Sequence, residues 1–223
     1  LGIVTRPNTV PRDTYRNIIE SSYYTINHIS KNMVERLYLA AVLVFFILAF
    51  AVKNIKTWLA TRQSIRGKSV KVNASIFLST AIYALILLRL IFNQPAWLVE
   101  FSFSSTLPGN VGVVLVSVGF VLGILALVSM RNSWRVGIKH EQKTELITSG
   151  IYRISRNPYF LSYNILILGF ILIFPSPVLA LLYLSLVVVF HQMILEEEQY
   201  LLKVHGQNYE AYRQKTGRYF TFR

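Results

Sequence analysis

Three consecutive acids, Glu196, Glu197 and Glu198, stand at the end of the last long apolar segment of the chain. A carboxylate beside a hydrocarbon core is costly, so acids in such a position are usually paired or take part in function. The same triplet could instead begin a solvated helix and pair with nearby bases such as Lys203. Residue types alone leave both interpretations open.

A group of hydrogen-bond donors precedes the fourth apolar segment. It contains Arg153, Arg156, Asn157 and Tyr159, with Pro158 between the last two. An asparagine followed by a proline is an ordinary start of a helix. Two arginines with an asparagine and a tyrosine also form a donor set that suits an anionic ligand.

The chain beyond residue 200 is rich in aromatic and basic side chains, among them Tyr209, Tyr212 and Arg218. Such a tail could lie in the membrane interface, or it could fold back as a cap over a site near the membrane surface. The histidines are scattered, and none has a spacing typical of zinc ligands, so we predict no metal site.

The segments that must position these residues are mostly apolar. The chain has 223 residues, of which 53% are hydrophobic and 15% are charged, whereas soluble domains carry about 25% charged residues. The apolar content excludes a disordered chain, and the absence of cysteine excludes a disulfide scaffold. The composition therefore predicts a polytopic membrane protein of the all-α class.

Five apolar segments are candidates for membrane-spanning helices, for which roughly 20 residues are needed. They cover about 37–56, 74–93, 110–130, 159–174 and 178–195. Only Pro175-Ser176-Pro177 separates the last two. Because proline interrupts a helix, we expect these two segments to form a helical hairpin.

Basic residues alternate between the loops that join these segments. Residues 53–71 carry six bases and no acid, residues 93–110 carry one acid and no base, and the loop after residue 130 and the tail are again basic. Positively charged loops stay in the cytoplasm, so we predict a cytoplasmic C-terminus with a cytoplasmic cap and an external N-terminus. The net charge of +13 then reflects orientation and contact with membrane lipids, not nucleic acid.

Several ordered motifs resemble the isoprenylcysteine carboxyl methyltransferase family and its membrane phospholipid methyltransferase relatives. The motifs are Gly150-x-Tyr152, Arg156-Asn157-Pro158, Glu197-Glu198-x-x-Leu201 and Gly206-x-x-Tyr209-x-x-Tyr212, with Asn132-Ser133-Trp134 and Leu146-Ile147 leading into them. The resemblance covers about residues 130–220. Asn157 stands where the family pattern has histidine, Phe160 where it has tyrosine and His205 where it has phenylalanine.

The resemblance implies that S-adenosylmethionine is the methyl donor, held by the C-terminal third of the chain at the cytoplasmic face. It implies binding of this cofactor by Leu146, Ile147, Gly150, Tyr152, Asn157, Pro158, Tyr159, Glu197, Tyr209 and Tyr212. It further implies catalytic roles for Arg156, Glu197 and Glu198, and binding of the substrate by Trp134, Arg153 and Arg218. One of the two glutamates would hold the cationic amino end of the cofactor or fix Arg156.

The expected organisation has three parts. Residues 1–36 form a non-spanning N-terminal extension without a catalytic part, in which isoleucines and a tyrosine at near-helical spacing are compatible with an interfacial helix. Residues 37–130 hold three membrane-spanning helices. Residues 131–223 hold the motif region, with the hairpin and a cofactor-binding tail.

The predicted reaction is O-methylation of the carboxylate of a lipophilic, isoprenylcysteine-like substrate that arrives from the bilayer. A phospholipid N-methyltransferase, or a methyltransferase of another lipophilic acceptor, is the alternative within the same class. An NADPH-dependent enzyme like the sterol reductases and a non-enzymatic membrane adaptor are alternatives from other classes. The departures from the family pattern leave the acceptor open, and the sequence predicts no oligomeric state.

Overall fold

The computed structural model describes residues 12–62, 66–67, 69–92, 101, 105–137 and 145–221, without the side chains of residues 12–32 and of residue 132. Within these ranges the secondary structure is helical, and the β-type pairing is confined to one isolated bridge between Arg66 and Val136. The chain divides into two units, residues 1–38 and 39–223. The prediction of an all-α protein is confirmed.

The helices follow one another in the order α1 to α6. Their bounds are α1 Arg12–Thr61, α2 Val70–Ile91, α3 Leu107–Ser129, α4 Pro158–Ile173, α5 Pro177–His205 and α6 Gln207–Lys215, with short 3-10 helices η1 Arg131–Ser133 and η2 Gly150–Arg153 between α3 and α4. Four stretches are long and apolar enough to cross a membrane: Met33–Thr61, Val70–Ile91, Leu107–Ser129 and Pro177–His205. The fourth predicted span, residues 159–174, corresponds to α4, which is apolar but has only 16 residues.

Two helices differ in extent from the sequence-based prediction. The helix predicted within residues 1–36 and the first span form one continuous helix, α1, because no glycine or proline interrupts Arg12–Thr61. Helix α5 continues beyond residue 195 to His205, so all three glutamates lie on regular helix. The polar residues after 195 favour helix as strongly as the apolar ones, and hydropathy marks only where the apolar run ends.

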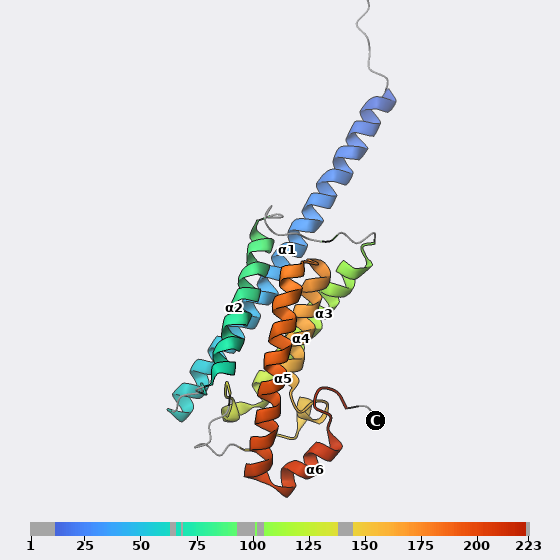
Figure 1. Ribbon diagram of the computed structural model, residues 1–223. Helices are drawn as coiled ribbons and strands as arrows, with labels where there is room; N and C mark the ends of the chain where they lie inside the picture. Colours follow the sequence, from blue (N-terminus) through green and yellow to red (C-terminus); the bar gives the residue numbers. More distant parts are fainter. Residues whose placement is uncertain are drawn as a thin grey trace, which may run out of the picture. The chain divides into compact units, whose positions relative to one another are not determined.

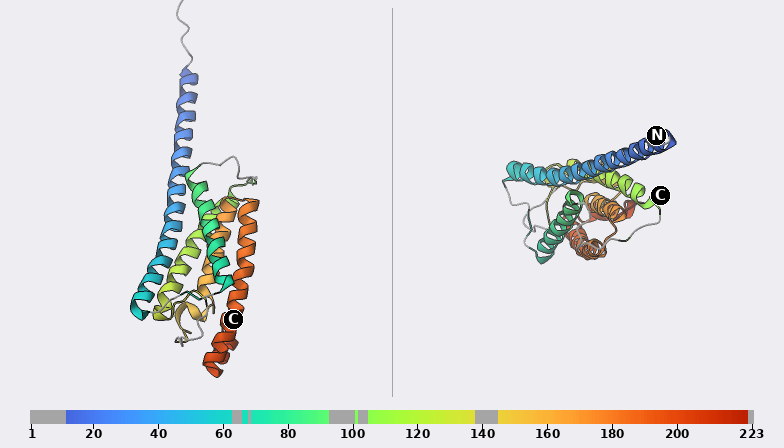
Figure 2. Two further views of the ribbon diagram at one scale, coloured as in Figure 1. Left: turned by 60° about the vertical axis from the view of Figure 1, so that its left-hand side comes forward. Right: turned by 90° about the horizontal axis from the view of Figure 1, so that it is seen from above.

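Helices α3 and α4 pack so closely that their backbones are in contact (Figure 2). A Cβ atom added to Gly119 of α3 would lie 2.6 Å from the backbone nitrogen of Leu166 in α4. A Cβ atom added to Gly169 of α4 would lie 2.6 Å from the carbonyl oxygen of Gly112 in α3. Small residues let membrane helices approach in this way, and the contact gains dispersion energy along both helices.

The hairpin of α4 and α5 is confirmed. Helix α4 ends at Ile173, and α5 begins at Pro177, which occupies a first-turn position where its missing N–H costs nothing. The linker is held from outside the hairpin, because the backbone N–H of Phe101 donates to the carbonyl of Pro175 at 2.9 Å.

The segment after α1, the segment after α3 and the end of α5 meet at one end of the helices, next to α6 (Figure 1). Lys53 donates to the carbonyl of Arg131 at 2.6 Å, and the backbone N–H of Gly67 donates to the carbonyl of Val136 at 2.8 Å. Lys71, at the start of α2, forms an ion pair with Glu196 of α5. The basic segments are thus gathered at a single end, together with the motif residues.

Candidate active site

One cavity of about 330 Å³ lies where these segments meet the helices. It is lined by α1, α2, α4, α5, α6 and the segments that follow α3. The sequence-predicted residues that line it are Trp134, Leu146, Ile147, Tyr152, Arg156, Asn157, Pro158, Tyr159, Glu197, Glu198, Tyr209 and Tyr212. The fold therefore brings most of the predicted site residues together around one space.

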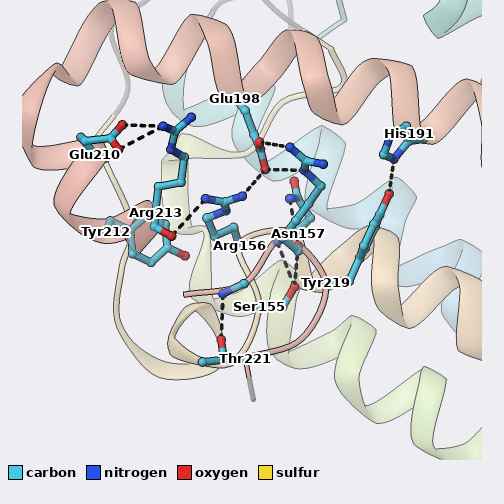
Figure 3. Close-up of polar contacts among 12 residues, drawn as sticks. Ser155, Arg156, Asn157, His191, Glu198, Glu210, Tyr212, Arg213, Tyr219 and Thr221 are labelled. Carbon is cyan, nitrogen blue, oxygen red and sulfur yellow. Dashed lines mark hydrogen bonds and ion pairs between the residues drawn. The ribbon is translucent and has the colours of Figure 1, made fainter. Parts of the chain in front are cut away.

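Glu198 is the centre of the polar end of this cavity (Figure 3). Its carboxylate accepts from Nη2 of Arg156 at 2.9 Å, and from Nε and Nη2 of Arg218 at 3.1 and 2.9 Å. The side chains of Glu198 and Arg156 are only 9% and 8% exposed. Charge-assisted hydrogen bonds that are withdrawn from water in this way are among the strong ones, so Glu198 fixes the position of Arg156.

The three acids reach three different surroundings, because successive residues of a helix point about 100° apart. Glu196 pairs with Lys71, Glu198 binds two arginines, and Glu197 faces the cavity. Glu197 interacts electrostatically with Arg135, which also lines the cavity. The buried pairing of Glu198 agrees with the first interpretation of the triplet and not with that of a solvated helix start.

The turn before α4 is held by the C-terminal segment. The backbone N–H of Arg156 donates to the carbonyl of Gly217 at 3.0 Å, and Nδ2 of Asn157 donates to the carbonyl of Arg218 at 3.1 Å. The backbone N–H of Asn157 donates to Oγ of Ser155 at 3.0 Å. Asn157 thus lines the cavity while its amide group is directed to the chain end.

Three tyrosines from η2 and α6 line the cavity. The hydroxyl of Tyr212 donates to the carbonyl of Tyr152 at 2.6 Å, and the ring of Tyr209 packs edge-on against that of Tyr212. Burial raises the pKa of Tyr209 to about 12, and burial likewise raises the pKa of Tyr152 and of Tyr212. All three phenols therefore stay neutral near pH 7 and can serve as hydrogen-bond donors.

Two buried polar atoms at this end have no hydrogen-bond partner among the described residues: Nε of Arg156 and the hydroxyl of Tyr209. Buried polar atoms are nearly always bonded, so each unbonded one calls for a reason. Both belong to residues that line the cavity. A bound ligand with acceptor oxygens would satisfy both donors.

The other end of the cavity is aromatic. Tyr159 stacks on Phe50 at 5.9 Å between ring centroids, and Trp134 packs edge-on against Tyr159 at 5.0 Å. Beyond them the lining continues with Ile47, Ser79, Tyr83, Phe160, Tyr163 and Phe190. Ile76 and Thr80 line the cavity and are also exposed on α2, so the aromatic end reaches the apolar outer surface of that helix.

Three sequence-predicted residues do not line the cavity. Gly150 begins η2 with a φ of +63°, a conformation in which glycine is unstrained. Arg153 is exposed, and the side chain of Arg218 binds Glu198.

Sequence analysis missed Arg135 and the aromatic lining residues of α1, α2 and α5. Neither a base in a basic loop nor an aromatic residue in an apolar run is distinguished from its neighbours by its sequence context. Within the described ranges no group of His, Asp and Glu side chains is arranged to hold a metal ion.

Known proteins match the part of the chain that contains this site. The family described as phospholipid methyltransferase matches residues 109–208, which run from α3 through the hairpin to the start of α6. The resemblance seen in the sequence is thereby confirmed, and the matched region contains Arg156, Asn157 and both cavity glutamates.

Individual relatives carry a more specific name. Over 108 residues the chain is 33% identical to a probable protein-S-isoprenylcysteine O-methyltransferase of Oryza sativa subsp. indica, and to one of subsp. japonica, covering 47% of this chain and 56% of each relative. Protein-S-isoprenylcysteine O-methyltransferase B of Arabidopsis thaliana is 28% identical over 163 residues, covering 68% of this chain and 79% of that relative. The match to the rice proteins thus spans little more than half their length.

Proposed function

We propose that this chain is an integral membrane methyltransferase that uses S-adenosylmethionine to O-methylate the carboxylate of an isoprenylcysteine-like lipophilic substrate. The observation that carries the proposal is the cavity, whose charged end and aromatic end suit two different ligands. A polar cofactor matches the charged end, and a lipid acceptor matches the aromatic end that opens on α2. The names of the relatives support the same chemistry.

The polar end fits the amino-acid part of this cofactor. Glu198 between two arginines leaves one positive charge in excess, and Nε of Arg156 and the hydroxyl of Tyr209 are donors without partners among the described residues. These groups suit a carboxylate, and Glu197 in the same wall suits an ammonium group. Leu146, Ile147, Tyr152, Asn157 and Tyr212 complete the wall that would hold the cofactor.

S-adenosylmethionine supplies an electrophilic methyl group on a positively charged sulfur. A carboxylate acceptor is already ionised at pH 7, so no side chain has to remove a proton from it. The work of the protein is then to hold the two reactants in line and to exclude water. Tyr159, Trp134 and Phe50 line the cavity and pack against one another, and they would exclude water from the reacting atoms.

The basic segments support the proposed orientation. They are gathered at the end of the helices that holds the cavity, and basic segments stay on the cytoplasmic side of a membrane. We therefore place the C-terminus and the active site in the cytoplasm and the N-terminus outside.

A methyl-transfer assay tests the function. The purified chain is offered radiolabelled S-adenosylmethionine with a farnesylcysteine analogue, phosphatidylethanolamine or a lipid extract in parallel reactions. We expect label in the farnesylcysteine analogue, released by base as expected of a methyl ester. Calorimetry with S-adenosylhomocysteine and with NADPH is the companion measurement: binding of NADPH alone would indicate a reductase, and binding of neither an adaptor.

N-methylation of a phospholipid is the second candidate. It is favoured by the family description and by Glu197, which faces the cavity and could accept the proton that an amine acceptor releases. Label in phosphatidylethanolamine instead of farnesylcysteine would identify this activity.

Replacement of Ser79 by phenylalanine is expected to block the aromatic end of the cavity. The larger side chain would occupy space that the acceptor needs, so the KM for the lipophilic acceptor should rise by at least about tenfold. The affinity for S-adenosylhomocysteine, measured by calorimetry, should stay within about twofold. Ser185→Phe is the matched control, because Ser185 is exposed on α5 and does not line the cavity. Equal KM values for the two variants would contradict the placement of the acceptor.

A further inference from the structure

Residues 216–221, which we call the C-terminal strap, are bound across the turn that precedes α4. The carbonyls of Gly217 and Arg218 accept from Arg156 and Asn157 as described above, and Oγ of Ser155 also donates to the carbonyl of Arg218, at 3.3 Å. In return, Oγ1 of Thr221 donates to the carbonyl of Ile154 at 2.8 Å. The strap therefore holds the turn that carries Arg156.

The strap is also attached to α5. Nδ1 of His191 and the hydroxyl of Tyr219 share a hydrogen bond of 2.7 Å, and the two rings stack (Figure 3). About two helical turns further along α5, Arg218 binds Glu198. Two neighbouring strap residues thus fix its position on α5, and the strap connects α5 with the start of α4.

Arg218 binds Glu198 with a two-pronged contact that Arg156 does not make. It uses Nε and Nη2 on the two carboxylate oxygens, whereas Arg156 uses a single nitrogen, Nη2, on one of them. A fork of this kind fixes the plane of the carboxylate as well as its place. With that plane fixed, Oε1 of Glu198 holds Arg156 by one nitrogen, and Nε of Arg156 stays without a partner among the described residues.

We infer that Arg218 is a positioning residue that prepares Arg156 for an anionic ligand through Glu198. The sequence resemblance implied that Arg218 binds the substrate directly. We infer the indirect role instead, because Arg218 does not line the cavity and its donors are directed to Glu198. It also explains the charge of this cluster. The pair of Glu198 and Arg156 alone would be neutral, and Arg218 leaves the three-residue cluster with one positive charge in excess. The identity of the ligand, a cofactor carboxylate, rests on the proposed function, whereas the coupling within the protein does not.

The test compares Arg218→Met and Arg218→Lys in the full chain, purified in detergent. Lys215→Met is the control, because it removes one positive charge from an exposed position three residues earlier. Calorimetry with S-adenosylhomocysteine is expected to show about tenfold weaker binding for Arg218→Met and an intermediate loss for Arg218→Lys, which keeps the charge without the fork. Lys215→Met should bind within about twofold of the unaltered chain.

Hydrogen exchange of the ligand-free protein is the second readout. The backbone amide of Arg156 should exchange faster in Arg218→Met, because its hydrogen bond to the carbonyl of Gly217 depends on the strap, and should not change in Lys215→Met. In the methyl-transfer assay the KM for the cofactor should rise while the KM for the acceptor is unchanged. A rise confined to the acceptor KM, or exchange and binding equal to those of Lys215→Met, would overturn the inference. Failure of the unaltered chain to bind S-adenosylhomocysteine would refute the proposed function, and the exchange measurement would still decide the role of Arg218.

Discussion

Replacement of Glu198 by glutamine is expected to destabilise the protein and to abolish cofactor binding. The change removes the only carboxylate among the described residues that forms an ion pair with Arg156, whose side chain is 8% exposed, and with Arg218. Loss of one member of a buried ion pair usually costs 3–5 kcal/mol. Because Arg218 is 35% exposed and partly solvated, we take the lower end, about 3 kcal/mol.

The measurement is thermal unfolding in detergent, followed by tryptophan fluorescence. A loss of this size should lower the midpoint by roughly 6 to 12 °C, and affinity for S-adenosylhomocysteine should fall by at least about 100-fold because the guanidinium of Arg156 loses its ion pair with Glu198. Glu210→Gln is the matched control, since Glu210 pairs with Arg213 at 3.0 Å near the protein surface. Such a pair is worth less than about 1 kcal/mol. Equal midpoints for the two variants would show that the Glu198 cluster contributes nothing to stability.

Replacement of Gly119 by alanine is expected to separate α3 from α4. The new Cβ would lie 2.6 Å from the backbone nitrogen and 2.8 Å from Cα of Leu166. Backbone atoms cannot rotate away as a flexible side chain can, so the helices must move apart. Overpacking typically costs 1–3 kcal/mol, and we expect about 3 kcal/mol here because the clash is with backbone.

Gly109→Ala in the same helix is the control. A Cβ at Gly109 meets no atom within 4 Å, so this variant should be as stable as the unaltered chain or more stable by about 0.5 kcal/mol, because alanine favours helix over glycine. Unfolding midpoints in detergent compare the two variants. If Gly119→Ala were as stable as Gly109→Ala, the close approach of α3 and α4 would be wrong. The contact matters for the site because α4 begins at Pro158, next to Arg156 and Asn157.

The polar end of the cavity was more predictable than the aromatic end. Motif residues such as Tyr152, Glu197 and Tyr212 share an order along the chain with a known family, and that order identified them before any contact was known. Phe50 and Tyr83 have no such signal, because an aromatic residue in an apolar helix is equally suited to core, lipid or cavity. Which of the three it faces depends on the rotation of its helix against its neighbours.

The sequence by itself determined that the chain is helical, rich in candidate membrane spans and similar to a methyltransferase family. Charge-free runs, the prolines between α4 and α5, and the alternation of basic loops act locally, so their consequences follow from composition and spacing. Only the tertiary structure decided which partner each glutamate of the triplet binds. Glu196 pairs with a lysine 125 residues away, and Glu198 pairs with arginines 42 and 20 residues away on opposite sides of it in the chain. Those partners are set by how α2, the turn before α4 and the strap pack against α5, which no local pattern records.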